Sequence, residues 1–407
     1  MATRIVQVDL AKPILPVGGL SGYGRVWLLI RHGRRPLGWV KFSRTFVGQE
    51  VRPETICDLI ADHLVLPTWN SLRAGPLPAL SHLPTASVIV CTRDHPDQLR
   101  RQLQSLARQE HPNYEVVVVD NAPRNDGTRQ VCEEFSFVRY VLEPEPGLDY
   151  ARNTGWRAAK NEIVAYTDDD ACVDPFWLAT ICDAYADPRV HCVTGLTLPF
   201  ELETPAQEYF ELYGGMQKGF RRRVYHPANW RTYFPLGSGH FGCGVNLSLR
   251  RSFLESLGGF DNALDTGSLT RGGGDLDIMA RVLQAGGSLV YEPCALVHHQ
   301  HRKTMPQLQR QMFDYGYGFF AYLAKFAGGD LELQNYAVRL MKDWLKIWGW
   351  RRLKTNFKAA VRLRPHFPIN LIVREMAGML LGPKSYKRAV QRVRTRAYLR
   401  KSRAAAS

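Results

Sequence analysis

The sequence predicts an α/β protein built on a largely parallel sheet, and the pattern that supports this begins at Ala86. Ser87–Cys91 and Tyr114–Val119 are short apolar runs with the length and valine content of buried strands. Between them, Pro96–Arg108 carries leucines at helical spacing. Strands that alternate with helices indicate parallel pairing through helical crossovers. The 407 residues, 45% of them hydrophobic, suffice for one large domain with smaller attachments.

The first eighty residues predict a small α+β domain. Arg25–Arg31 and Leu37–Phe42 have the composition of strands, and the turn-prone Gly33–Pro36 between them indicates a hairpin. Thr55–Leu64 has apolar residues at helical spacing and predicts one amphipathic helix. The proline-rich stretch Pro67–Pro84 is typical of a linker, so we expect a domain boundary there. The expected domains are residues 1–80 and 86–328, followed by a basic helical region over 330–407.

Polar residues follow each predicted strand of the large domain. Thr92-Arg93-Asp94 follow the first strand and Asp120-Asn121 end the second, while Asp168-Asp169-Asp170 follow the apolar run 163–167. Ligands of open α/β sheets bind outside the carboxyl ends of the strands. We therefore expect these three groups to converge on one crevice.

Three consecutive carboxylates repel one another, so such a cluster usually persists because a cation or a ligand neutralises it. Oxygen ligands favour a hard cation, Mg²⁺ or Mn²⁺. The alternative is a polar turn in which Asp170 or Asp174 caps a helix that begins near Pro175. The residues by themselves leave these two interpretations open.

The net charge of +15 is concentrated in the C-terminal region. Residues 331–407 hold 19 Lys and Arg against 3 Asp and Glu, which leaves residues 1–330 with a net charge of −1. Tryptophans with basic flanks suit an anionic membrane surface. The alternative is a helix whose apolar face packs on the large domain. Nucleic acid ranks last as a partner of 388–403, because no aromatic stacking platform accompanies the charge. The apolar stripe in question consists of Val338, Met341, Trp344, Leu345 and Trp348.

The eight cysteines are scattered and form no CxxC pair, which predicts reduced thiols and a cytoplasmic location. Residues 1–20 show no secretion signal, and the nearest candidate for a membrane span, Ile369–Leu381, contains Arg374 and Glu375. We therefore expect a cytoplasmic protein, with the basic region allowing peripheral contact at the inner face of the membrane. A dinucleotide-dependent oxidoreductase is disfavoured, because no glycine fingerprint follows the first strand.

Six motifs occur in a fixed order along the large domain: Ser87–Arg93, Val116–Asn121, Gly147–Asn153, Asp168–Asp170, Gly258–Asp261 and Gly273–Asp277. With these motifs the chain resembles the family 2 glycosyltransferases over roughly residues 86–325. The resemblance implies the GT-A fold, a mixed and mostly parallel sheet flanked by helices. It also implies inverting transfer of a sugar from a nucleoside-diphosphate donor, with Mg²⁺ or Mn²⁺ as cofactor.

The resemblance also assigns roles to single residues. Asp275 matches the base that takes the proton of the acceptor hydroxyl. The metal ligands would be Asp168, Asp170 and His299, with His301 in reserve. The contacts to the nucleotide sugar would come from Thr92, Arg93, Asp120, Arg152, Asp168, Asp169 and Asn246.

Each assignment has a structural alternative. Asp120 can cap a turn, Arg152 can be a surface cation on a helix, and Asp275 can cap the helix expected from Leu276. The glycine-rich stretch 242–246 can be a tight turn, and a histidine near 299 can serve packing alone.

One position departs from the family pattern, because Gly274 stands where a glutamate usually precedes the base. Glycine removes a carboxylate and loosens the backbone, which leaves room for Asp277 to contribute. We expect a metal-dependent inverting glycosyltransferase of cell-surface polysaccharide, glycolipid or glycoconjugate synthesis, whose acceptor is a glycan, a lipid or a small molecule. The alternative is a non-catalytic nucleotide-sugar binding protein.

Overall fold

The computed structural model describes residues 2–43, 50–77, 80, 82–229, 236–362 and 367–404. The strands are β1 (Ala2–Asp9), β2 (Tyr23–His32), β3 (Arg35–Ser43), β4 (Ala86–Thr92), β5 (Tyr114–Asn121), β6 (Val138–Glu143), β7 (Ile163–Asp168), β8 (Ala171–Val173), β9 (Val190–Pro199), β10 (Arg223–Tyr225), β11 (Leu247–Arg250) and β12 (Ser288–His299). The helices are α1 (Pro53–Ala74), α2 (Pro96–Leu106), α3 (Gly127–Glu133), α4 (Leu148–Ala158), α5 (Trp177–Ala184), α6 (Pro205–Tyr213), α7 (Arg251–Ser256), α8 (Gly274–Gln284), α9 (Met305–Phe326), α10 (Leu331–Asp343), α11 (Arg352–Val361), α12 (Ile369–Leu381) and α13 (Pro383–Ala404).

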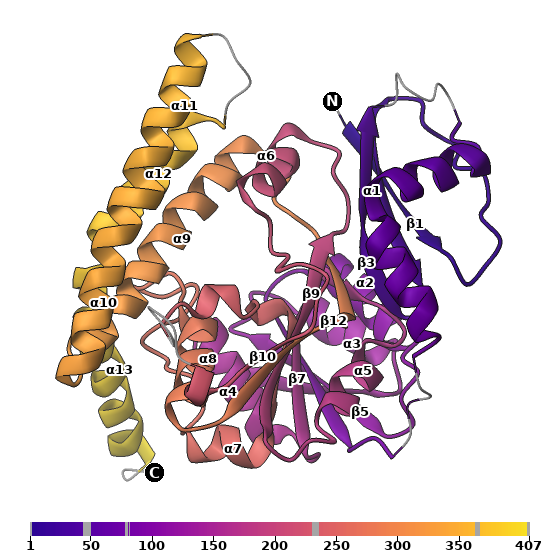
Figure 1. The fold of residues 1–407 in the computed structure, drawn as a ribbon. Helices are drawn as coiled ribbons and strands as arrows, with labels where there is room; N and C mark the ends of the chain where they lie inside the picture. The colour runs from indigo at the N-terminus through magenta and orange to yellow at the C-terminus, as the bar shows by residue number, and fades with distance from the viewer. Residues whose placement is uncertain are drawn as a thin grey trace.

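A nine-stranded mixed sheet runs through the middle of the molecule (Figure 1). Its order is β10-β12-β9-β11-β7-β4-β5-β6, and β8 pairs with β12 beside this path. β7, β4, β5 and β6 are mutually parallel, whereas β11 is antiparallel to both of its neighbours. The predicted α/β class with a mixed, mostly parallel sheet is confirmed.

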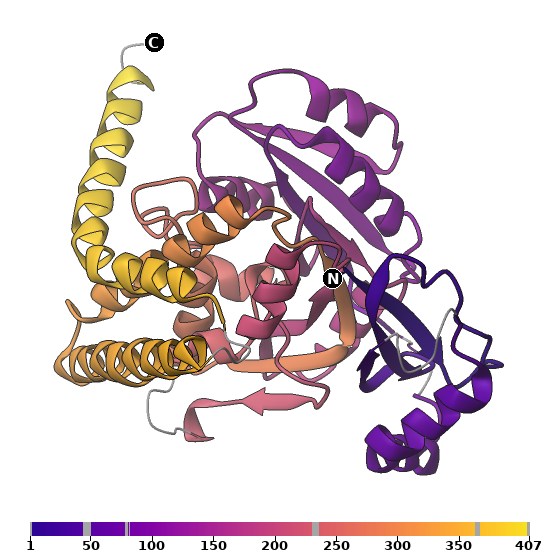
Figure 2. The ribbon, with the colours of Figure 1, turned by 90° about the horizontal axis from the view of Figure 1, so that it is seen from above.

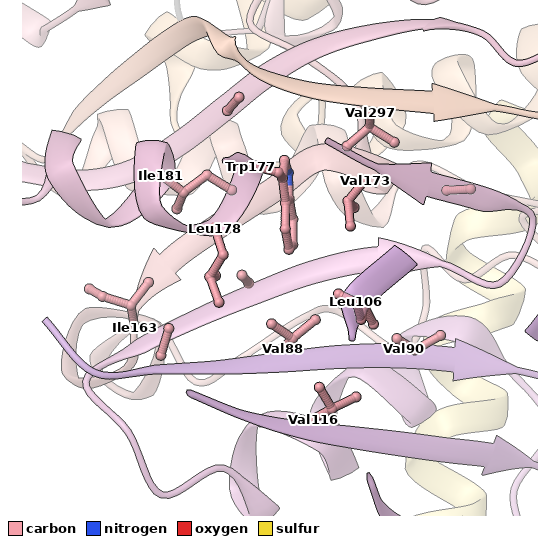
Figure 3. Close-up of a cluster of buried hydrophobic side chains, with 14 of the residues drawn as sticks. Val88, Val90, Leu106, Val116, Ile163, Val173, Trp177, Leu178, Ile181 and Val297 are labelled. Carbon is pink, nitrogen blue, oxygen red and sulfur yellow. The ribbon is translucent and has the colours of Figure 1, made fainter. Parts of the chain in front are cut away.

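The core lies between this sheet and its covering helices. Val88 and Val90 of β4 and Val116 of β5 face the side on which α5 places Trp177, which has no exposed surface (Figure 3). Burying one such apolar side chain stabilises the fold by about 1.5–3 kcal/mol. Because β4 and β5 are covered on both faces, they are continuous apolar runs rather than alternating ones.

The register of the parallel strands brings their polar ends together. Thr92 of β4 lies opposite Asp120 of β5, and Cys91 lies opposite Asp168 of β7. The expected convergence of three polar strand ends therefore follows from the pairing itself.

The N-terminal part forms its own three-stranded sheet, with β1 parallel to β2 and the predicted hairpin of β2 and β3. Leu29 of β2 packs against Leu196 and Leu198 of β9. Close by, Arg31 Nη1 pairs with Asp174 Oδ2 at 2.7 Å in the segment after β8. The expected linker starts later than predicted, since α1 continues to Ala74. The helix accommodates Pro67 by leaving helical geometry at Leu64.

The C-terminal helices pack along α9, on the side of the central sheet opposite to the N-terminal sheet (Figures 1 and 2). α10 and α11 join through a π-helical segment, Trp344–Arg351. Trp344 packs on Phe319 of α9, with ring centroids 5.0 Å apart, and Trp348 packs on Tyr213 of α6 at 6.0 Å. For these two tryptophans the structure shows the packing alternative. Among the described residues, no helix has the length and apolar character that crossing a membrane requires.

Candidate active site

Two carboxylates and an imidazole meet at the ends of β7 and β12. Asp168 ends β7, Asp170 follows it, and His299 ends β12. Pairing of β8 with β12 sets Ala171 opposite His299, which brings the imidazole beside the acidic cluster. His299 Nε2 lies 3.2 Å from Asp170 Oδ1. One ligand atom from each of Asp168, Asp170 and His299 lies within 4.8 Å of the other two.

The charges of this cluster are only partly balanced by the chain. Burial, followed by the charge of Asp170, raises the pKa of Asp168 to about 6. Burial opposes ionisation of Asp170 as well, but the imidazole of His299 outweighs it and lowers the pKa of Asp170 to about 2. Burial likewise lowers the pKa of His299, and attraction to Asp170 raises it by more. Two crowded carboxylates with one imidazole form a set of donors that a divalent cation would stabilise.

A second layer of residues holds the imidazole in place. His299 Nδ1 lies 3.3 Å from His301 Nδ1, and His301 Nε2 lies 2.9 Å from Glu211 Oε1 of α6. Arg302 adds a cation, with Nη1 3.6 Å from Asp170 Oδ2. Such outer partners fix the ring orientation of a ligating histidine. The structure therefore places His301 behind His299.

The middle aspartate of the cluster turns toward the end of β4. Asp169 Oδ2 accepts a hydrogen bond of 2.6 Å from Thr92 Oγ1 and lies 3.1 Å from His95 Nδ1. Thr92 and Asp169 are thus bonded to each other, beside the metal-ligand set.

At the neighbouring strand end, Asp120 is fully buried and Arg93 is at the surface. Burial raises the pKa of Asp120, and a hydrogen bond of 3.0 Å from the Tyr140 hydroxyl partly offsets this. The Arg93 side chain is 47% exposed, with Nε 3.8 Å from Asp94 Oδ2. Asp120 is therefore fixed in position, whereas the Arg93 guanidinium retains open surface for a ligand.

Arg152 is a buried cation of α4 and is not the surface residue of the structural alternative. Its Nη1 donates to Asp149 Oδ1 at 2.9 Å, and its guanidinium lies over the Phe260 ring at 5.3 Å. Burial lowers the pKa of Arg152, but the carboxylates of Asp149, Asp168 and Asp275 together raise it further. One guanidinium thereby couples the metal-ligand set to Asp275.

Asp275 sits in the first turn of α8 with both carboxylate oxygens oriented by backbone groups. Gly244 N–H donates to Oδ2 at 2.9 Å, and Leu276 N–H donates to Oδ1 at 2.9 Å. The side chain is partly exposed. The bond to its own helix is local, whereas the bond from Gly244 fixes the carboxylate against a loop 31 residues away.

Gly274 has a steric reason in this fold. A Cβ added there would overlap Oδ2 of Asp149, which points into the space that a side chain at 274 would fill. Asp149 is itself held from behind, because its N–H donates to Asp265 Oδ1 at 2.9 Å. The carboxylate that Gly274 lacks is therefore present in the same space, supplied from α4.

Two residues considered in the sequence analysis have structural partners instead. Asp277 is fully buried and pairs with Arg281 at 2.7 Å and with Lys325 at 2.6 Å, so it has no free oxygen for an acceptor. Asn246 is also fully buried. Its amide receives a bond from Trp177 and donates to the carbonyls of Leu196 and Ala295, which does not fit the expected sugar contact.

Comparison with known proteins agrees with this geometry. Residues 87–258 match the family model described as glycosyl transferase family 2. These residues therefore form a family 2 glycosyltransferase domain. Over 317 residues, covering 75% of the chain, it is 30% identical to the pre-mycofactocin glycosyltransferase of Mycobacterium tuberculosis. The match spans 61% of that relative's length.

More distant relatives of the family 2 domain extend the comparison. A glucosyl-dolichyl phosphate glucuronosyltransferase of Haloferax volcanii is 26% identical over 247 residues, which is 57% of this chain and 75% of that protein. A mannosyltransferase from Pyrobaculum calidifontis, solved with GDP-Man and Mn²⁺, superposes with a TM-score of 0.52 at 20% identity. That match covers 80% of this chain and 96% of the other. The predicted GT-A fold is confirmed.

Sequence reasoning did not find three residues of the site. Asp149 lies in the third motif but belongs to no charge cluster in the sequence, and Asp265 lies more than a hundred residues farther along. Arg302 follows the noted histidines as one more basic residue. The glycine at 274 could have indicated Asp149, because a position without a side chain often leaves room for one from elsewhere in the fold.

Proposed function

We propose that this protein is a metal-dependent inverting glycosyltransferase that moves a sugar from a nucleoside-diphosphate donor to an acceptor hydroxyl. The observation that carries the proposal is a buried cation between two groups. A Cβ built on Gly244 would lie 2.5 Å from Arg152 Nη2 and 3.2 Å from Asp275 Cβ, so these two side chains are neighbours. The charge of Asp168 in the metal-ligand set also acts on Arg152 and raises its pKa. A transferase needs both groups at one reaction centre.

The residues present fit a divalent cation. Two carboxylate oxygens and one imidazole nitrogen lie close enough to share one ion, and Asp168 has a pKa raised to about 6 by burial and by Asp170. Asp168, Asp170 and His299 would hold the ion, which would stabilise the negative charge that develops on a leaving diphosphate. Mixed oxygen and nitrogen donors suit Mn²⁺, and Mg²⁺ remains the second candidate.

Asp275 is proposed to accept the proton of the acceptor hydroxyl. Inversion in one displacement requires a base on the sugar face opposite the leaving group. The two backbone N–H groups on Asp275 hold its carboxylate in one orientation. Arg152 adds a fixed positive charge that needs no reorganisation when the diphosphate leaves.

The proposed donor is a nucleoside-diphosphate sugar. Asp120 and Arg93 at the strand ends are the proposed nucleotide contacts, with Thr92 and Asp169 behind them. The proposed acceptor belongs to polysaccharide, glycolipid or glycoconjugate synthesis, and the glucosyl-dolichyl phosphate glucuronosyltransferase among the relatives supports the glycolipid case.

The alternative, a nucleotide-sugar binding protein without catalysis, was motivated by Gly274. It loses this support because Asp149 supplies a carboxylate in that space. The test is Asp275→Asn, which preserves shape and removes the base. We expect transfer or donor hydrolysis to fall about 10²–10⁴-fold with donor binding unchanged. Equal turnover by Asp275→Asn and the wild type would contradict the proposed role.

We also propose that the outer face of the C-terminal helices contacts an anionic membrane from the cytoplasmic side. Residues 344–362 contain six Lys and Arg and no Asp or Glu. Four large apolar side chains there are 52–69% exposed: Ile347, Trp350, Phe357 and Val361. Exposed apolar groups among basic side chains match the chemistry of an anionic lipid surface. The proposed contact residues thus differ from the stripe that contains Trp344 and Trp348.

A further inference from the structure

A basic pocket lies beside the candidate active site, between α9, α12 and the segment that enters α8. Its volume is about 280 Å³. The lining residues are Arg271, Pro306, Gln309, Arg310, Phe313 and Arg374. None of the roles proposed above uses these residues.

The pocket has an excess of positive charge. Asp314 pairs with Arg271 at 2.7 Å and lies 3.8 Å from Arg310. Arg374 makes no ion pair within the part of the chain that the structure describes. Three guanidinium groups and one carboxylate leave a net charge of +2, which matches a dianion.

Arg271 is held in place against a conformational cost. Its φ of +63° is unusual for a residue other than glycine, and such a conformation persists only where the surrounding structure imposes it. The ion pair with Asp314 and the rings of Phe313 and Tyr317, at 5.3 and 5.5 Å, fix the guanidinium at the pocket. Strain of this kind is concentrated at functional sites.

Two short chain segments connect this pocket to the candidate active site. Arg271 precedes Asp275 by four residues, so their backbones are at most about 14 Å apart. Arg302, whose guanidinium lies 3.6 Å from Asp170, precedes Pro306 by four residues. α9 also packs against this loop, since a Cβ at Gly318 would lie 3.0 Å from the Gly272 carbonyl carbon. The pocket therefore lies within reach of a molecule that also contacts Asp275, since Arg271 is at most about 14 Å from it along the backbone.

We infer that the pocket binds a phosphate group carried by the acceptor, so that the acceptor is a phosphorylated molecule. The inference rests on the proposed transferase function and names its substrate class. Guanidinium groups match phosphate oxygens with paired N–H donors. The proposed function assigns the donor's diphosphate to a cation held by Asp168, Asp170 and His299, which leaves the Arg271 pocket for a second anion. The phosphate belongs either to a soluble acceptor or to a lipid headgroup.

The pocket is tested with the metal-free chain, because EDTA removes the cation on which diphosphate binding at Asp170 depends. Calorimetry with glycerol 3-phosphate compares the wild type with Arg374→Gln and Arg310→Gln. The matched control is Arg339→Gln, an exposed arginine of α10 outside the pocket. We expect each pocket variant to weaken binding about tenfold or more, the effect of one lost bond to a charged group, and the control to bind as the wild type does. Equal affinity in all four proteins would overturn the inference.

Vesicles separate the two sources of phosphate. For the same proteins we measure binding to phosphatidylcholine vesicles that contain roughly 20 mol% phosphatidic acid. This lipid supplies the anionic surface that attracts Lys and Arg. Weaker vesicle binding by Arg374→Gln and Arg310→Gln assigns a lipid-borne phosphate. Unchanged vesicle binding with weaker glycerol 3-phosphate binding assigns a soluble acceptor. Metal-dependent nucleotide binding by Arg374→Gln stays at the wild-type level, so failure of the transferase proposal is seen separately.

Discussion

The reaction centre and the outer face of the C-terminal helices handle charge in opposite ways. In the centre, carboxylates and cations are buried and in contact, as Arg152 is with Asp149 at 2.9 Å. On the outer face, residues 344–362 contain six Lys and Arg without any Asp or Glu, and exposed apolar groups such as Trp350 stand among them. Buried charge needs partners within the fold or a bound ion, whereas exposed charge is free for an external partner. The first region is thus built for precise chemistry and the second for attachment.

The largest loss of stability is expected when the buried cation Arg152 loses its partner carboxylate. Asp149→Ala leaves Arg152 without its hydrogen-bonded carboxylate, and we expect a loss of about 3–5 kcal/mol in unfolding free energy. Denaturant unfolding measures this. Asp187→Ala is the control, because it removes an exposed ion pair between Asp187 and Arg189. Loss of a surface ion pair is expected to have little effect. Equal losses in the two variants would contradict the account of Arg152.

The C-terminal helices also contain one buried carboxylate, Glu375, which is expected to make the stability of the protein depend on pH. Burial raises the pKa of Glu375 in α12 to about 7, although a hydrogen bond from the Tyr213 hydroxyl partly offsets it. A raised pKa in the folded state favours folding below the unfolded value near 4.5. This contribution is lost as pH rises through about 7, and its size is on the order of 3 kcal/mol.

We therefore expect the wild type to lose more stability between pH 4.5 and 8 than Glu375→Gln, which cannot ionise. Unfolding free energies of both proteins at the two pH values give the difference. The same pH dependence in both would show that Glu375 ionises without cost.

The steric exclusion between Gly274 and Asp149 predicts that two substitutions will not be additive. Gly274→Ala alone overpacks the site, and we expect a loss of about 1–3 kcal/mol. In an Asp149→Gly background the three nearest atoms to the new Cβ are gone, so we expect the same change to cost less and a double-mutant cycle to show coupling. Gly239→Ala is the matched control, since a Cβ there meets nothing closer than Leu276 at 4.0 Å. Additive losses at 149 and 274 would show that the two residues do not share that space.

The smallest expected effect concerns attachment. Trp350→Ala together with Phe357→Ala removes exposed apolar area, and we expect about tenfold weaker binding to anionic vesicles. Binding of the wild type is expected to weaken with salt, because lipid attraction to each Lys or Arg is screened. Trp69→Ala, which changes an exposed tryptophan of α1, is the control. Loss of vesicle binding in that control would place attachment outside the C-terminal helices.

The sequence predicted the parts of the fold that depend on local pattern. Valine-rich β4 and β5 and the polar residues at their ends were recognisable because buried parallel strands are continuous apolar runs. β1 was not predicted, since Arg4 and Gln7 interrupt its apolar residues. The helical end of α1 was missed because Pro67 usually stops a helix, and here a break at Leu64 allows it to continue. The division into residues 1–80, 86–328 and 330–407 stays a prediction.

The sequence predicted many residues of the site, but it did not predict which of them contact one another. The metal-ligand set gathers Asp168, Asp170 and His299 from two strand ends, and the family resemblance supplied that grouping. The overlap of Asp149 with the Gly274 position joins residues far apart in the chain, which no local pattern encodes. The tryptophan stripe was read with the α-helical period, but a π-helical segment begins at Trp344 and changes which side chains face outward.

The most direct test of the central claim is thermal stabilisation by UDP, GDP and dTDP, each with and without Mn²⁺, of the wild type and Asp170→Ala. A ligand that binds only the folded protein raises its apparent stability by about 2.7 kcal/mol at a hundredfold excess over Kd. The account predicts that one nucleotide stabilises the wild type, that Mn²⁺ is required, and that Asp170→Ala abolishes the effect. Stabilisation by none of the three nucleotides with Mn²⁺, or an equal shift in Asp170→Ala, would contradict a metal-dependent donor site at the end of β7.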